Sequence, residues 1–290
     1  MVIKAGPAWS GKSFRIAGMM CAPHKARMFV LDGHAFPNDT ESFRAALAQG
    51  LKLHGAGEGA VMIEGNFPSF ETLGMNLTGA RLDARTQLAR ASENVAGGFF
   101  THTLYITAEP ALLASVPIRI RLHAKDCVFA FGTAEDGTRA AWVESCASGT
   151  LDAAAATADI ETGLLALARD AASQHGAEVE SVRLTLTAES PWRIAVTAIA
   201  VAKAMFFTAT LAIRGDVALD EELNLRLSGT DCTGNGMLAN LAAAQLRPRL
   251  AELERRTFPI RLLLPPGLRP AEITLTGGAA LQIRATLGGK

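Results

Sequence analysis

The chain has 290 residues, with 28 basic and 28 acidic side chains and a pI near 7.0. This balance leaves no basic surface of the kind that DNA or RNA binding requires, so nucleic-acid binding is excluded. Hydrophobic residues make up 49% of the chain and aromatic residues only 6%, which predicts a large aliphatic interior that is either solid or lines an apolar cavity.

The N-terminal segment Gly6–Ser13 matches the phosphate-loop pattern G-x-x-x-x-G-K-[ST]. In that pattern, backbone N–H groups bind the phosphates, Lys12 would reach the outer phosphates and Ser13 would bind magnesium. A working loop joins a buried strand to a helix. Here no convincing strand precedes Gly6, and Pro23 interrupts the expected helix. Residues 1–35 are therefore predicted to be an N-terminal extension, possibly disordered.

A helix is predicted to follow Asn38–Thr40, whose side chains suit an N-cap, because apolar residues recur after it at helical spacing: Phe43, Ala46, Leu47 and Leu51. Four apolar residues then crowd a turn: Phe67, Phe70, Leu73 and Met75. If these four are exposed, they would form a membrane-docking loop or a channel mouth. If they fold under a sheet, they form a cap, and this is the favoured alternative because exposed apolar clusters are uncommon on soluble proteins.

Two-residue alternation of apolar and polar side chains is the main signal in the rest of the chain. In residues 117–123, Ile118, Ile120 and Leu122 share one face, and the residues between them are basic. Its repetition predicts a large antiparallel sheet with one wet face and one apolar face. The same alternation recurs over 182–187, 223–227, 273–276 and 281–284, and more weakly over 61–64, 82–85, 104–107 and 127–131.

Two further helices are predicted among these strands. One covers about Asp159–Gln174 and carries an apolar stripe of Ile160, Leu164, Leu167 and Ala171. The other covers about residues 237–256 and carries Leu238, Leu241, Leu246, Leu250 and Leu253 on one face. Between the two helices, Ile194–Ile213 is long enough to cross a bilayer. The charge of Lys203 and the β-branched residues of this segment favour strands instead.

Three further patterns receive structural interpretations. Gly234–Ala239 matches the dinucleotide pattern G-x-G-x-x-G/A, but the next predicted strand ends in Pro265–Pro266 where a ribose-binding acid should stand, so the glycines predict a strand-to-helix hinge. The acidic stretch Asp216–Glu222 lies between strand patterns and predicts a solvated turn. Four cysteines and six histidines are scattered without ligand spacing, so no metal and no cofactor is expected.

The C-terminal third carries a family resemblance. A glycine-rich linker and a helix are followed by Leu264–Arg269 (LPPGLR) and Ile273–Gly278 (ITLTGG). This order resembles LmeA-type bacterial phospholipid-binding proteins, which are related to the tubular lipid-binding (TULIP) superfamily. Ile63–Phe70 is similar to the strand of that family that ends in a Gly and Phe-Pro turn. The resemblance implies one domain over residues 36–288, with an α+β, mainly β fold. In that fold a long, strongly curved antiparallel sheet wraps around two or three amphipathic helices.

The resemblance further implies an elongated hydrophobic channel that binds a phospholipid or fatty acid, for lipid transport or envelope maintenance, with no catalysis and with possible peripheral membrane contact. Each buried methylene contributes about 0.8 kcal/mol, so such a channel gains affinity without polar specificity. Candidate ligand-binding residues come from the helix stripes and the most apolar strand: Leu164, Leu167, Phe206, Phe207, Leu238 and Leu241. For each of them, ordinary core packing is the alternative.

Two alternative functions stay open. The leading one is a structural or interaction protein with a solid core, and the other is a phosphate-loop enzyme that uses Lys12 and Ser13. Members of the resembled family are usually exported to the periplasm or the cell envelope. The sequence shows no apolar N-terminal core with a small-residue cleavage site, so it predicts no compartment.

Overall fold

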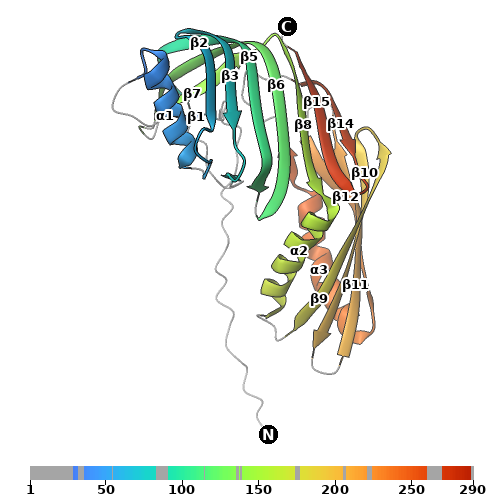
Figure 1. The fold of residues 1–290 in the computed structure, drawn as a ribbon. Coiled ribbons are helices and arrows are strands. Elements are labelled where there is room, and N and C mark those ends of the chain that lie inside the picture. Colours follow the sequence, from blue (N-terminus) through green and yellow to red (C-terminus); the bar gives the residue numbers. More distant parts are fainter. Residues whose placement is uncertain are drawn as a thin grey trace.

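The computed structural model describes residues 29–31, 36–53, 55–82, 91–113, 115–134, 137, 139–173, 177–204, 207–220, 224–259 and 270–288. The phosphate-loop pattern Gly6–Ser13 and the motif Leu264–Arg269 lie outside these residues. In the described part the fold is α+β and mainly β, with large antiparallel sheets and three helices, as the sequence predicts (Figure 1).

The larger sheet has ten strands in the described part of the chain, and its main order is β14-β15-β8-β6-β5-β3-β2. Beside this path, β7 pairs with β6 and with β1, and β4 pairs with β5. All these pairings are antiparallel except those of β3 and β4 with β5, which are parallel. The strands are β1 (Phe29–Val30), β2 (Val61–Asn66), β3 (Ser69–Asn76), β4 (Arg81–Leu82), β5 (Ala91–Leu113), β6 (Val116–Ala134), β7 (Arg139–Ser145), β8 (Ser148–Ala156), β14 (Pro270–Thr276) and β15 (Ala280–Gly288).

A second sheet has five antiparallel strands in the described residues, in the order β13-β12-β11-β10-β9. They are β9 (Glu178–Ser190), β10 (Arg193–Ala204), β11 (Phe207–Leu219), β12 (Asn224–Asn235) and β13 (Thr257–Pro259). The described residues of the segment Ile194–Ile213 therefore lie in β10 and the first half of β11, as its strand-forming residues predict. None of the described helices is long and apolar enough to span a membrane.

Helix α1 (Thr40–Lys52) covers the core of the ten-stranded sheet. Asp39 is its N-cap and accepts a hydrogen bond from the Ser42 N–H at 2.8 Å, which holds the pKa of Asp39 below its ordinary value. The helix buries Phe43 fully, and the Phe43 ring lies edge-on to Phe99 with centroids 4.7 Å apart. α1 is thus a core helix, positioned where the sequence predicts it.

The candidate membrane or channel-mouth residues lie beneath this helix. Phe70, Leu73 and Met75 are on β3 and are at most 2% exposed, and Phe67 packs against the same core. The docking-loop alternative is therefore wrong for the three buried residues, which take the cap-like position. The reason is that residues 69–76 form a strand beside β5 rather than a turn.

The N-terminal boundary also differs from the expectation. β1 pairs with β7, with Phe29 opposite Ala141, and Leu31 is 3% exposed. Residues 29–31 were predicted to belong to an extension, but they contribute a strand and a core side chain to the folded part.

Candidate functional site

The five-stranded sheet has a continuous apolar face. Val182 of β9, Ala200 of β10 and Leu211 of β11 are directly opposite one another, and so they share this face. Residues between them, such as Arg183 and Thr197, belong to the other face. We use the name open face for the half-buried apolar residues on the shared side: Val182, Leu184, Val196, Ala198, Ala200, Ala202, Ala209, Leu211 and Ile213.

The centre of the open face is built from small side chains. Three successive positions of β10 on this side are Ala198, Ala200 and Ala202, and Ala209 lies opposite Ala202. Protein cores reach crystal-like packing density by filling such central positions with larger residues. The alanines contribute little volume of their own, and all four remain half-buried. These four positions therefore stay partly accessible on the apolar face.

Helix α2 (Thr157–Ser173) is attached to one edge of the five-stranded sheet. Glu161 accepts a hydrogen bond from the Leu184 N–H at 2.6 Å, and Arg169 Nε donates to the Val179 carbonyl oxygen at 2.8 Å. Both backbone groups belong to β9, the edge strand. An exposed edge presents unpaired backbone groups, and here side chains of a helix satisfy them.

Helix α3 (Met237–Glu254) makes the same kind of attachment on the opposite side. Arg247 Nε donates to the Cys232 carbonyl oxygen at 3.1 Å, and Glu254 accepts a hydrogen bond from the Thr230 N–H. That bond lowers the pKa of Glu254 below its ordinary value. In the described part, β12 pairs with β13 only over Asn224–Arg226, so these two bonds hold an edge that no strand covers. The two helices therefore hold the two sides of the sheet.

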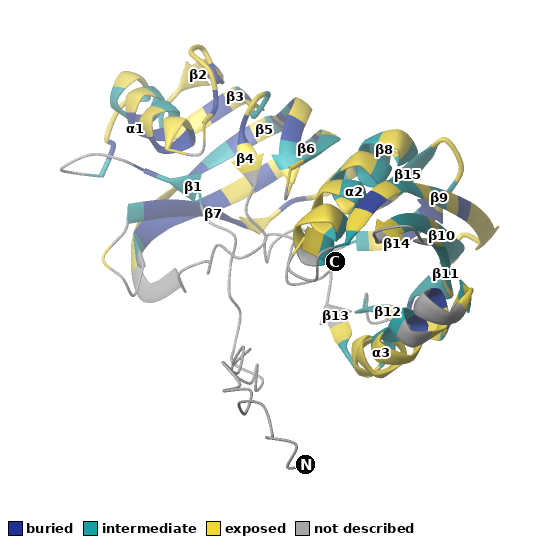
Figure 2. Cartoon of the chain, turned by 90° about the horizontal axis from the view of Figure 1, so that it is seen from below, coloured by how far each residue is buried: buried dark blue, intermediate teal, exposed yellow. Residues whose placement is uncertain are grey.

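Burial separates these two helices from α1. No α2 residue with a described side chain is fully buried, and among the α3 residues with described side chains only Ala239 and Ala243 are buried. Helix α1, by contrast, buries Phe43, Leu47 and Leu51 together with two smaller residues. Figure 2 shows a related contrast between the sheets, because buried colour dominates β7 while β10 and β11 are mostly intermediate. The helices attached to the five-stranded sheet thus leave its apolar face incompletely covered.

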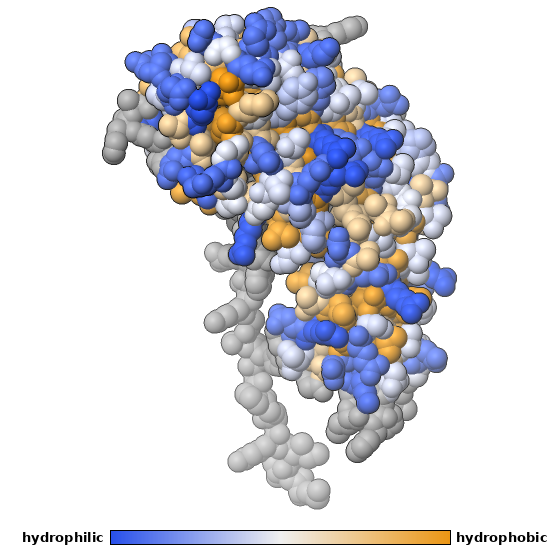
Figure 3. Space-filling model, in the orientation of Figure 1, coloured by the Kyte–Doolittle hydropathy of each residue, from blue (hydrophilic) through white to orange (hydrophobic). Residues whose placement is uncertain are grey.

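The predicted ligand-binding residues are distributed unevenly around this face. Leu164 and Leu167 on α2 are 37% and 66% exposed, and Figure 3 shows hydrophobic surface over this part of the molecule. Phe206 lies outside the described residues, as do the side chains of Phe207, Leu238 and Leu241. The backbone places Phe207 at the start of β11 and Leu238 and Leu241 in the first turns of α3.

Most of the open face was absent from the predicted site. The alternation of residues 182–187 and the apolar run 194–213 contained the signal. Which strands would pair, and therefore which residues would share a face, follows only from the register.

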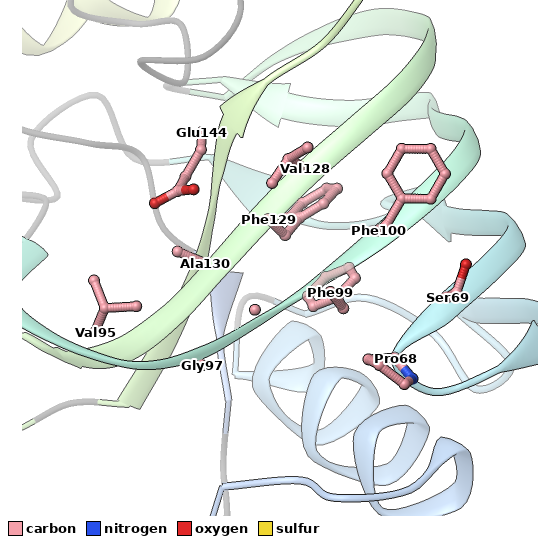
Figure 4. A pocket seen from close by; sticks show the side chains of 11 residues that line it. Pro68, Ser69, Val95, Gly97, Phe99, Phe100, Val128, Phe129, Ala130 and Glu144 are labelled. Carbon is pink, nitrogen blue, oxygen red and sulfur yellow. The ribbon is translucent and has the colours of Figure 1, made fainter.

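A second apolar feature lies on the ten-stranded sheet, between β5 and β6 (Figure 4). It is a shallow depression of about 510 Å³ over Gly97 and Gly98, with Glu144 and Val95 at one end and Pro68 and Ser69 at the other. Its other lining residues are Phe99, Phe100, Val128, Phe129 and Ala130. It is more open than the pockets that usually hold small molecules.

The acidic stretch at residues 216–222 takes part in ion pairs. Asp216 lies inside β11 and pairs with Arg193, and Asp220 pairs with Arg226 at 3.2 Å. The turn predicted for this stretch therefore begins later, because β11 continues to Leu219. Among the described residues, no group of three or more His, Cys, Asp or Glu side chains could hold a metal ion.

The described cysteines are buried and poorly ionised. Burial raises the pKa of Cys127 to about 12, with a smaller contribution from Cys146, and burial also raises the pKa of Cys146 and Cys232. Because the thiolate is the reactive form, we expect iodoacetamide at pH 8 to alkylate Cys127 about a hundredfold or more slowly in the native protein than in urea. Peptide mass spectrometry over a time course measures this ratio for each cysteine. Equal rates in the two states would contradict the burial of Cys127.

The open face thus combines a continuous apolar surface, an alanine centre and two helices attached at the sheet edges. Comparisons of the chain with protein-family models, with curated proteins and with solved structures found no match.

Proposed function

We propose that this protein binds a phospholipid or fatty acid through its acyl chain on the open face, and that it does so without catalysing a reaction on the ligand. The observation that carries the proposal is the half-buried apolar face between α2 and α3. A hydrocarbon chain needs no hydrogen-bonding partners, and the open face offers only aliphatic side chains. Lipid transport or envelope maintenance is the physiological role that we propose.

The energetics favour an acyl chain over a polar ligand. Each methylene removed from water contributes about 0.8 kcal/mol, so about ten buried methylenes supply the roughly 8 kcal/mol of a micromolar complex. Leu211 and Ile213 would contact the chain from β11, and Ala198 and Ala200 would give it room above β10. In this arrangement, Leu164 and Leu167 extend the apolar surface along α2.

The tubular arrangement is part of the same proposal. In Figure 2, β9, β10, β11 and β12 follow one another around a bend, with α2 beyond β9 and α3 beside β12. This view supports a sheet that curls around its ligand, as the resemblance to LmeA-type proteins implies.

An interaction protein is the second candidate, and the same face favours it. Apolar patches that stay exposed on soluble proteins mark interaction sites, and a second protein could cover the open face. Native mass spectrometry of the purified full-length protein separates the two candidates. An extra mass that organic extraction resolves into phospholipid or fatty acid supports lipid binding. A lipid-free dimer, unchanged after incubation with phosphatidylcholine vesicles, would overturn it.

A matched pair of variants tests the site itself. Ala200→Trp places an indole on the open face, and we expect it to reduce co-purified lipid about tenfold or more because the ring occupies the central space. Ala212→Trp is the control, since Ala212 is a half-buried alanine of the neighbouring strand on the opposite face. Quantitative lipid mass spectrometry measures both variants after circular dichroism has confirmed folding. Equal lipid contents in the two variants would place the ligand elsewhere.

A further inference from the structure

Two buried cysteines lie next to each other in the ten-stranded sheet. Val128 of β6 is opposite Ser145 of β7, and Cys127 and Cys146 are the next residues beyond this pair along the two antiparallel strands. Val128 and Ser145 are exposed, whereas Cys127 and Cys146 are 0% and 3% exposed. Because neighbouring residues of a strand point to opposite faces, both thiols point into the hydrophobic core cluster, to which both cysteines belong.

The pairing with β6 continues on the other side of the two cysteines. Lys125 of β6 is opposite Ser148 of β8, and the Ala147 N–H donates to the Lys125 carbonyl oxygen at 3.0 Å. The junction between β7 and β8, which contains Cys146, is therefore held against β6 at both ends. Cys127 occupies the part of β6 that faces this junction.

This arrangement suits a covalent bond between the two sulfur atoms. Residues opposite each other in antiparallel strands have Cα atoms about 4.5–5.5 Å apart, and a disulfide joins residues whose Cα atoms are about 4.4–6.8 Å apart. The strands therefore need little displacement to form the bond. The pKa of Cys127 is raised by burial and, to a smaller extent, by the charge of Cys146, as expected for neighbouring thiols. In this structure both thiols are free.

We propose that Cys127 and Cys146 are a redox-dependent modification site, at which a small-molecule disulfide such as glutathione disulfide produces a cross-strand disulfide bond. One cysteine thiolate attacks the sulfur–sulfur bond of the small molecule and releases one of its thiolates. The second cysteine thiolate then attacks the mixed disulfide and releases the other. The two cysteines lose two electrons and two protons, and both pass to the two glutathione thiols. The site does not depend on the proposed function, because neither cysteine belongs to the open face.

Burial determines when this bond forms. The thiolate is the reactive form, and burial of Cys127 and Cys146 suppresses both ionisation and access in the folded protein. We therefore expect the bond to form while the chain folds, before the core closes over the two thiols. Cys232 is the internal control, since it is also 0% exposed but lies on β12 of the five-stranded sheet, opposite Ile213.

Refolding of the full-length protein from urea, in a mixture of reduced and oxidised glutathione, tests the site. Trypsin cuts after Lys125 and Arg139, which places Cys127 and Cys146 on separate peptides, so mass spectrometry without reduction detects their bond. We expect the peptide pair that joins Cys127 to Cys146 to be about tenfold or more abundant than any pair that contains Cys232, because only the first pair is adjacent in the fold.

Urea denaturation of the refolded protein provides the second measurement. The midpoint of the oxidised wild type should exceed that of the reduced wild type by about 1 M, because the closed loop 127–146 restricts the unfolded chain. Cys146→Ser should abolish this difference, and Cys146→Ala replaces it if a buried hydroxyl prevents folding.

Two results would overturn the proposal. The first is a folded wild type that lacks the Cys127–Cys146 peptide pair, or that contains pairs with Cys232 at equal abundance. The second is an oxidised form with a lower urea midpoint than the reduced form, because the bond would then strain the sheet instead of fitting it. Both results come from the wild type, so the test does not depend on the folding of either variant.

Discussion

Phe43→Ala is expected to lower the free energy of unfolding by about 3–5 kcal/mol, which is the cost of removing a fully buried aromatic side chain. Phe43 is 0% exposed, and its ring lies 4.7, 5.3 and 6.3 Å from the rings of Phe99, Phe70 and Phe67, centroid to centroid. The cavity would be surrounded by β-sheet and by the rest of α1, which cannot collapse into it. Urea denaturation followed by circular dichroism measures the loss.

The control for this experiment lies on α2. Leu167→Ala removes an apolar side chain from a helix of similar length, but Leu167 is 66% exposed, so its stability change should stay within about 0.5 kcal/mol. The difference between the stability changes of Phe43→Ala and Leu167→Ala tests whether α2 is a core helix. A loss of about 2 kcal/mol or more for Leu167→Ala would show that α2 packs on a solid core, and the open face would then lose its basis.

Local patterns predicted the elements well, because they depend on neighbours in the sequence. Helix α1 has its N-cap, Asp39, within the predicted capping stretch Asn38–Thr40, and α2 spans Thr157–Ser173 against a prediction of about 159–174. Alternation located β6, β9, β12, β14 and β15, since a strand buried on one side repeats every two residues. The first half of β5 was missed, because Gly97 and Gly98 interrupt its pattern.

Burial could not be predicted in the same way, because it depends on distant parts of the chain. α1 and α2 both carry apolar stripes, yet Phe43 is buried and Leu167 is exposed. The difference arises from what each helix meets: α1 meets the rings of β3 and β5, and α2 meets the edge of β9. No periodicity distinguishes the two cases. The edge contacts of Glu161 and Arg169 likewise had no signal in the sequence, because charged residues on a helix usually mark a solvated face.

The candidate residues chosen from the sequence therefore overlap little with the open face that we propose as the binding site. Leu164 and Leu167 were selected from a helix stripe, whereas the open face is formed mainly by strand residues such as Ala198 and Leu211. A search of the sequence for lipid-contacting residues does not select alanines, because small side chains contribute little contact area. Only the strand register shows that these alanines lie side by side at the centre of the apolar face.

Gly234→Ala is expected to destabilise the protein by about 1–3 kcal/mol or more, through a clash between β12 and α3. A Cβ atom at Gly234 would lie 2.3 Å from the carbonyl carbon of Ala239 and 2.4 Å from its oxygen. These are backbone atoms of the first turns of α3, so no side-chain rotation can relieve the contact. Gly57→Ala is the control, because a Cβ there meets no atom within 4 Å, and we expect little loss in thermal unfolding.

The same variant tests the interpretation of the dinucleotide-like pattern. Gly234 and Ala239 are the first and last residues of G-x-G-x-x-A, and they are the two residues in closest approach. The contact between strand and helix is thus sufficient to require small residues here. Because α3 holds one side of the open face, Gly234→Ala should also lower the co-purified lipid in proportion to the displacement of α3. A variant as stable as the wild type would show that α3 does not approach β12 this closely, and the proposed lipid-binding face would lose one of the two helices that border it.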